Sequence, residues 1–116
     1  MEQSNSEEDY WMEKETAVYR EKLRRYYADN GKLIQYPQKR PMRILALVKI
    51  AEQFENGKQY TEKEVNEKIK ETIVFNDVEL IRRELYEYKF LDRQRDGSSY
   101  WVRESWRETY RNYLEE

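Results

Sequence analysis

Seven basic side chains in this chain are candidates for contacts with the phosphates of duplex DNA. Arginine and lysine neutralise phosphates, and such contacts give affinity that does not depend on base sequence. Three of the seven lie in the segment 30–51, which contains five basic residues and no acidic residue, and the others follow as two arginine pairs. The candidates are Lys39, Arg40, Arg43, Arg82, Arg83, Arg93 and Arg95.

Each group also has an interpretation without DNA. The basic connector 39–43 lies at the start of a predicted helix, where free N–H groups favour phosphate, but it equally suits a solubilising linker. The arginines Arg93 and Arg95 flank a predicted hairpin, where they would contact the DNA backbone, or would protect an exposed strand edge by charge.

The arginine pair 82–83 lies on the helix that we expect to approach the major groove. Arg83 is four residues from both Glu79 and Glu87, and such spacing allows ion pairs on the helix surface. Asp77 and Glu79 place negative charge at the start of this helix, where a reading helix meets bases. Base readout by this helix is therefore disfavoured.

Enzyme chemistry has little support in the composition. The chain has no histidine and no cysteine, which removes the usual general base, thiol nucleophile and transition-metal ligands. Its three glycines each fall in a predicted turn, so no phosphate-binding glycine loop occurs. We therefore predict no catalytic residues, no metal site and no cofactor.

The overall charge gives a second, opposing argument about DNA. The chain has 116 residues, 22 of them basic and 24 acidic, and a net charge of −2. Dedicated nucleic-acid binders are often strongly basic. Aromatic residues make up 15% of the chain, which indicates a folded protein. No signal peptide or membrane-spanning run is visible, so we expect a cytoplasmic protein without a membrane partner.

Apolar periodicity and local signals outline the elements that would position the basic residues. Helices are predicted over 7–29, 41–55, 62–71, 78–89 and 104–115. Thr61 and Glu64 form a capping box, and Asp77 is a candidate cap for the helix that follows it. The Asp96–Gly97 pair predicts a hairpin over 91–102. The predicted core is Ile44, Leu47, Val48, Ala51, Phe54, Val65, Ile69, Ile81 and Leu85.

This order of elements is typical of a winged helix-turn-helix, an α+β and mostly helical fold, here with added N- and C-terminal helices. We divide the chain into an N-terminal helical extension (1–30), a winged-helix domain (31–103) and a C-terminal helix (104–116). Neither terminal helix buries its aromatic stripe alone, so we expect them to pack on each other or across a homodimer. The predicted interface residues are Tyr19, Tyr26, Trp106 and Tyr110.

An ordered series of short motifs runs from residue 31 to about residue 102. It comprises Gly31–Leu33, Tyr36–Pro37 with Lys39, Phe54–Glu55 with Gly57, Tyr60–Glu62 with Glu64–Asn66, Asp77, Arg82–Leu85, Leu91 with Arg93, and Asp96–Gly97 with Tyr100–Trp101. In this series the chain resembles an uncharacterised bacterial domain-of-unknown-function family that often follows ArsR-like winged-helix regulators and also occurs alone. Such domains usually have a glycine before the hairpin, where this chain has Lys89–Phe90.

The resemblance implies a context of transcription regulation but supplies no catalytic residue and no ligand. Together with the basic middle of the chain, it favours a DNA-binding transcriptional regulator or a DNA-linked regulatory module. The alternative is a winged-helix module that binds other proteins and never contacts DNA. A continuous positive face over the third core helix and the hairpin would distinguish the first from the second.

Overall fold

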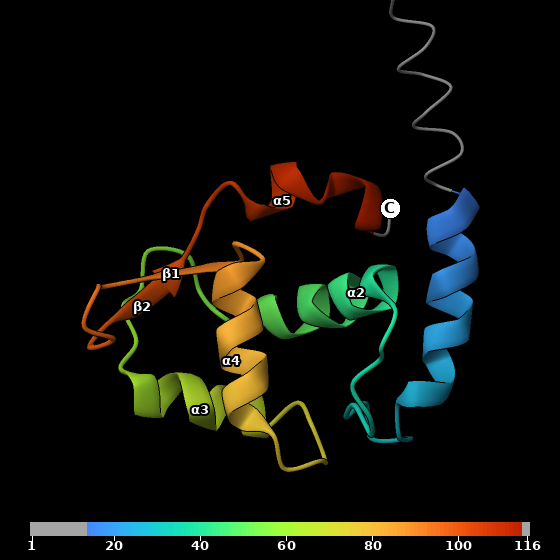
Figure 1. Ribbon diagram of the computed structural model, residues 1–116, viewed down its shortest axis with the longest axis horizontal. Helices are drawn as coiled ribbons and strands as arrows, with labels where there is room; N and C mark the ends of the chain where they lie inside the picture. The colour runs from blue at the N-terminus through green and yellow to red at the C-terminus, as the bar shows by residue number, and fades with distance from the viewer. Residues whose placement is uncertain (1–13, 115–116) are drawn as a thin grey trace, which may run out of the picture.

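Helices form most of the computed structural model, which describes residues 14–114, and a small antiparallel sheet lies at one edge of it (Figure 1). The fold is α+β and mostly helical, as predicted. In chain order, residues 14–23 are helical and continue into the 3-10 turn η1 (Arg24–Tyr26). The later elements are α2 (Arg40–Ala51), α3 (Glu62–Lys70), α4 (Val78–Glu87), β1 (Leu91–Arg93), β2 (Tyr100–Val102), α5 (Trp106–Thr109) and η2 (Arg111–Tyr113).

Helix α2 is the centre of the core, and it is buried on more than one face. Eight of its 12 residues are buried, because α4 and the sheet cover one side while the terminal segments cover another. It begins at Arg40 with Pro41 in its first turn, where a missing N–H leaves no hydrogen bond unmade. It ends at Ala51 rather than near residue 55, yet Phe54 beyond it remains buried.

The capping box that starts α3 is confirmed. The Glu64 N–H donates to the Thr61 hydroxyl at 3.1 Å, and the Thr61 N–H donates to the Glu64 carboxylate at 2.9 Å. The cap predicted for α4 is wrong in its chemistry. Asp77 does stand at the N-cap position, but its side chain accepts no hydrogen bond from the helix, because its backbone (φ −148°, ψ 55°) departs from the usual capping conformation.

A tight reversal joins α4 to the sheet. The Phe90 N–H donates to the Leu85 carbonyl at 2.9 Å, and the Lys89 N–H donates to the Tyr86 carbonyl at 3.0 Å. This pair of bonds is the Schellman motif, whose turning residue takes a left-handed conformation. That residue is Lys89, at φ 71°, where glycine would be free of strain.

The predicted hairpin is confirmed. Strands β1 and β2 pair antiparallel, with Leu91 opposite Val102 and Arg93 opposite Tyr100. Gly97 in the connecting turn has φ 77°, which glycine adopts readily. Tyr60 extends the sheet by one residue, since its N–H and carbonyl each bond Tyr100 at 2.8 Å.

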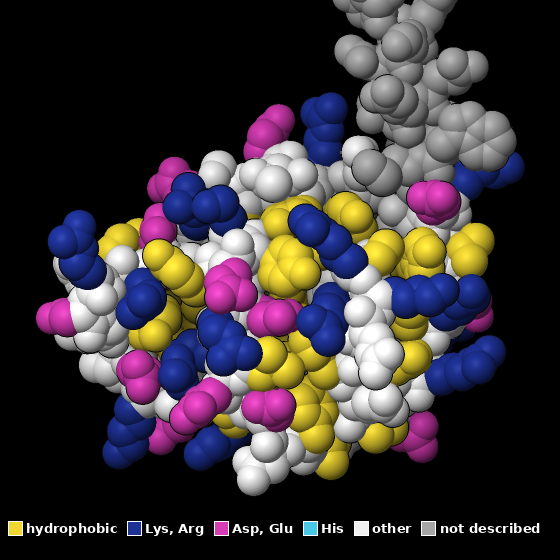
Figure 2. All heavy atoms as spheres, in the orientation of Figure 1, with side chains coloured by type: hydrophobic (Ala, Val, Ile, Leu, Met, Phe, Trp, Pro, Cys, Tyr) yellow, Lys and Arg dark blue, Asp and Glu magenta, His cyan; other side chains and the backbone are white. Residues whose placement is uncertain are grey.

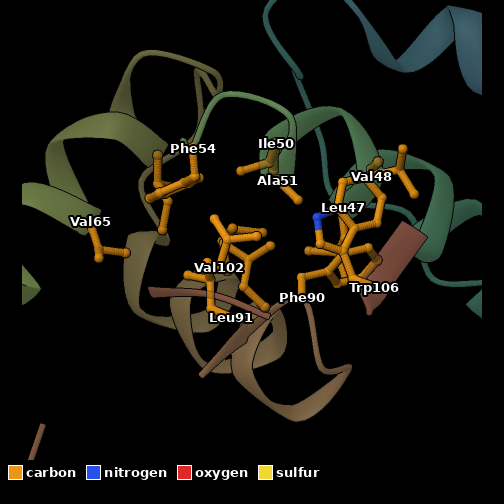
Figure 3. Close-up of a cluster of buried hydrophobic side chains, with 14 of the residues drawn as sticks. Leu47, Val48, Ile50, Ala51, Phe54, Val65, Phe90, Leu91, Val102 and Trp106 are labelled. Carbon is orange, nitrogen blue, oxygen red and sulfur yellow. The ribbon is translucent and has the colours of Figure 1, made fainter. Parts of the chain in front are cut away.

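All nine predicted core residues are buried, and further residues that this list omitted complete the core (Figure 3). Phe90, Leu91, Val102 and Trp106 pack with them although the first three lie at or in the hairpin. Within residues 14–114, no helix combines the length and apolar character that crossing a bilayer requires.

The N-terminal and C-terminal segments lie side by side against α2 and contact each other, which is one of the two arrangements predicted for them. Leu23, Met42 and Leu45 form a second apolar cluster that Tyr19 and Tyr113 cover. A guanidinium N–H of Arg20 also reaches the carbonyl of Tyr113 at 3.3 Å. The N-terminal helix stops at residue 26 instead of 29, residues 7–13 of that prediction lie outside the described residues, and the C-terminal helix divides into α5 and η2.

Candidate nucleic-acid interface

Arg43, one of the predicted DNA contacts, is held inside the protein by three neighbours. Its Nε–H donates to the carbonyl of Pro37 at 2.7 Å, and its Nη1 lies 3.4 Å from a carboxylate oxygen of Glu84 on α4. Its guanidinium also lies 4.7 Å from the centroid of the Tyr36 ring. Its side chain is 28% exposed and that of Glu84 is 12% exposed. These contacts tie the connector before α2 to α4.

The hydroxyl of Tyr36 completes this cluster by donating to the other carboxylate oxygen of Glu84. Burial and the adjacent Glu84 raise the pKa of Tyr36 well above its usual value, so the phenol stays protonated. A tyrosine, an arginine and a glutamate thus satisfy one another between α2 and α4. The cluster has a structural role, and it leaves Arg43 with little freedom to turn toward a phosphate.

Arg82 is held in a similar way between α3 and α4. Its Nη1–H donates to the side-chain oxygen of Asn66 at 2.6 Å, and its Nη2 lies 3.8 Å from Glu62. The side chain is 17% exposed. It therefore cross-links the two helices rather than presenting a charge to solvent.

Lys39 and Arg40 are exposed at the start of α2, but both lie beside tyrosine rings. The ammonium of Lys39 is 6.0 Å from the centroid of Tyr19, and the guanidinium of Arg40 is 5.2 Å from that of Tyr88. These contacts involve the ring faces and leave the N–H groups available to a phosphate.

Arg83, Arg93 and Arg95 remain, and they lie on the two elements that Tyr86 and Arg93 bring together, α4 and the hairpin. Arg93 lies 4.8 Å from the ring centroid of Tyr86, which is 39% exposed on α4. Arg83 is one helical turn before Tyr86, and Arg95 lies two residues beyond Arg93 toward the hairpin tip. We call these four residues the α4–hairpin surface.

The two outer arginines of this surface have no internal partner. Within the described part of the chain, the side chains of Arg83 and Arg95 form no ion pair and no hydrogen bond, and both residues are exposed. In particular, Arg83 pairs with neither Glu79 nor Glu87, so the predicted i,i+4 ion pairs are absent there. Tyr86 was not among the predicted site residues, although an exposed aromatic beside arginines on one helix was a usable signal.

Negative charge is close to this surface. Figure 2 shows lysine and arginine side chains intermixed with aspartate and glutamate over the face formed by α3 and α4. At the hairpin tip, hydrogen bonds from Ser98 hold the pKa of Asp96 below its usual value. The face that would meet DNA is therefore mixed in sign and lacks the continuous positive potential that would have favoured DNA outright.

The four predicted interface residues occupy different environments. Trp106 is 2% exposed and packs against Phe90, with ring centroids 5.2 Å apart, so its surface is covered within one chain. Tyr110 stacks on Phe90 at 4.7 Å, and its hydroxyl donates to the carbonyl of Tyr88 at 2.7 Å. Tyr19 and Tyr26 are partly exposed on the N-terminal segment.

The segment from the connector to the end of β2 has a recognisable counterpart. Residues 32–102, more than half of the chain, match a family model described as "Uncharacterized protein conserved in bacteria (DUF2087)". The chain belongs to the DUF2087 family. The match to DUF2087 contains α2, α3, α4 and the hairpin, hence the whole α4–hairpin surface, whereas both terminal segments lie outside it. No curated protein and no solved structure showed significant similarity to the chain.

Proposed function

We propose that this DUF2087 protein is a winged-helix protein that binds duplex DNA through the α4–hairpin surface, as a transcriptional regulator or a DNA-linked regulatory module. The order helix α2, the Tyr60 bridge, α3, α4, β1 and β2 supports the winged-helix assignment, because the bridge supplies the short third strand that such folds place before their second helix. The proposal implies work in the cytoplasm, where bacterial DNA lies.

The observation that carries the proposal is the contact between Arg93 of the hairpin and the exposed ring of Tyr86 on α4. It joins a helix and a hairpin into one surface, with exposed Arg83 on the same helix as Tyr86 and exposed Arg95 two residues beyond Arg93. Arginines held beside a helix can contact consecutive phosphates while the helix lies along the groove. Arg43 and Arg82 leave the set of proposed contacts, because protein groups already bind them.

Three arginines and the mixed charge around them predict weak binding. Each phosphate contact contributes about 0.9 to the slope of log K against log salt, so three contacts give a slope of about −3. With so few phosphate contacts and no base readout, we expect a dissociation constant in the non-specific range, about 10⁻⁴ to 10⁻⁶ M at physiological salt.

Fluorescence anisotropy of a labelled random duplex tests this proposal at low and moderate salt. The triple variant Arg83→Gln, Arg93→Gln, Arg95→Gln should bind about tenfold or more weakly, with a flatter salt slope. A control with the same loss of charge is Lys22→Gln, Arg25→Gln, Arg111→Gln, all exposed on the terminal segments. Equal weakening by the two triple variants would reduce the effect to net charge and refute a contact surface.

The mixed charge over α3 and α4 favours one alternative, a winged-helix module that binds another protein. Exposed Tyr86 with flanking arginines is also the kind of residue set that dominates protein interfaces. Absence of binding to any duplex even at low salt would refute the DNA proposal and leave this alternative.

We also propose a homodimer, now through the exposed parts of Tyr19 and Tyr26 rather than through Trp106. Winged-helix regulators that meet two-fold DNA sites are commonly dimers with added helices at the interface. Light scattering at high micromolar concentration tests this. A monomer mass there would refute the dimer while leaving the DNA proposal untouched.

A further inference from the structure

A cavity of about 630 Å³ lies between the N-terminal helical residues, α2 and the C-terminal segment. In Figure 1 these three pieces border one region, on the side away from α3 and the hairpin. The volume is within the range of small-molecule sites, about 300–1,000 Å³. Most of its lining comes from residues outside 32–102, so the cavity is made by the terminal segments against one helix of the DUF2087 domain.

The wall of the cavity is partly apolar. Leu23, Leu45 and Val48 line it with the ring of Tyr27 and the methyl group of Ala17. The first three are 2–5% exposed, so they are fixed in the packed interior and form a preformed surface. Such a surface suits the hydrocarbon or aromatic part of a ligand.

Charged groups surround this apolar wall, and basic ones predominate. The basic residues lining the cavity are Arg20, Arg24, Lys49 and Arg107, and the acidic ones are Glu21 and Glu52. The two glutamates pair only loosely with arginines, at 3.7 Å and 3.9 Å, through side chains that are all more than 40% exposed. Exposed pairs of this kind are weak and yield readily to a competing anion.

Tyr27 adds an aromatic ring to the wall of the cavity. It lines the cavity, the ammonium of Lys49 lies 5.7 Å from its ring centroid, and its hydroxyl is buried without a hydrogen-bond partner in the part of the chain described. Burial raises the pKa of this phenol well above its usual value, so it remains a donor at neutral pH. The hydroxyl itself is shielded from solvent, so Tyr27 contributes its ring rather than its hydroxyl to the cavity wall.

We propose that this cavity binds a small amphipathic carboxylate, with its apolar part on Leu45 and Val48 and its carboxylate among the basic residues near Lys49. The basic excess selects an anion, the apolar wall selects a hydrocarbon or aromatic body, and the volume limits the ligand to a small molecule. The site is independent of the α4–hairpin surface, so it stands whether or not the protein binds DNA.

The test uses the full chain and the anionic fluorophore 8-anilinonaphthalene-1-sulfonate as the probe. Sodium decanoate should displace the bound probe, whereas decanol and decylammonium at equal concentration should not. Displacement by all three alike would overturn the proposal, because it would show an apolar surface without selection for an anion. Displacement that varies with protein concentration would also overturn it, because a second copy of the chain would then be the occupant.

Two pairs of variants locate the site. Lys49→Gln should weaken decanoate binding about fivefold, the effect of losing one partly solvated charge contact, while Lys63→Gln on α3 should not. Ala17→Phe should fill the cavity and weaken binding about tenfold or more, while Val18→Phe, at an exposed position next to it that does not line the cavity, should not. All four positions are exposed and lie outside the packed core, and circular dichroism verifies folding. Equal affinity in Ala17→Phe and wild type would place the ligand elsewhere.

Discussion

The variant Arg43→Gln tests whether Arg43 stabilises the fold or contacts DNA. The sequence alone made Arg43 a candidate DNA contact, because it lies in the basic connector. The change removes the 2.7 Å bond to Pro37, the 3.4 Å ion pair with Glu84 and the stacking on Tyr36. A hydrogen bond from a charged donor contributes about 1.5–3 kcal/mol, and a cation over a ring contributes about 0.5–1 kcal/mol. Because Glu84 is 12% exposed and loses its counter-charge, we expect a total loss of about 2–4 kcal/mol.

Urea denaturation followed by tryptophan fluorescence measures this loss, and in thermal denaturation it should appear as a fall in Tm of about 8–15 °C. Arg40→Gln is the matched control, since Arg40 is exposed and lies beside the ring of Tyr88, so its cost should be within about 0.5 kcal/mol. A double variant that also carries Glu84→Leu should be less unstable than the two single losses predict. Wild-type stability in Arg43→Gln, together with lost DNA binding, would refute the structural role.

Three further changes follow from the packing. Trp106→Ala should cost about 3–5 kcal/mol in urea denaturation, because the ring is buried on Phe90; a loss of dimer without a loss of stability would contradict this. Lys89→Gly should raise the unfolding free energy by about 0.5–1 kcal/mol by relieving a left-handed backbone, and a decrease would show that Lys89 makes a compensating contact. Burial raises the pKa of Tyr27 and Tyr36, so the fold favours their protonated forms and their contribution is complete below the unfolded pKa of about 10. Stability should therefore fall above pH 10 by up to about 1.4 kcal/mol per pH unit for each tyrosine, and Tyr36→Phe should flatten this fall; an unchanged slope would contradict it.

Local signals in the sequence were sufficient to predict the helices, the hairpin and much of the core. Thr61, Pro41 and Asp96–Gly97 marked the right starts and turn, because capping and turn chemistry depend on near neighbours. The left-handed residue at Lys89 fell where the resemblance expected glycine, since the geometry of the reversal persists when the side chain changes.

The candidate site was less predictable, because the partners of a long side chain are set by tertiary structure. Arg43 meets Glu84 across 41 residues, and Arg82 meets Asn66 across 16, so neither contact has a signature in the local sequence. The i,i+4 spacing of Arg83 was visible, but within the described residues neither of the predicted ion pairs forms. The cavity at the termini joins segments from opposite ends of the chain and left no local pattern at all.

The reversal between α4 and β1 has a mechanical consequence. Tyr88, Lys89 and Phe90 are the only residues between the two elements, and the N–H of each is bonded back to a carbonyl of α4. Because Phe90 is also fully buried, the junction lacks a flexible residue, and we expect α4 and the hairpin to move together as one rigid unit. This face is therefore preorganised, and a partner that binds it should lose little conformational entropy in doing so. One residue inserted here would reverse the inward and outward faces of β1, whereas the exposed tip at residues 95–96 should accept insertions readily.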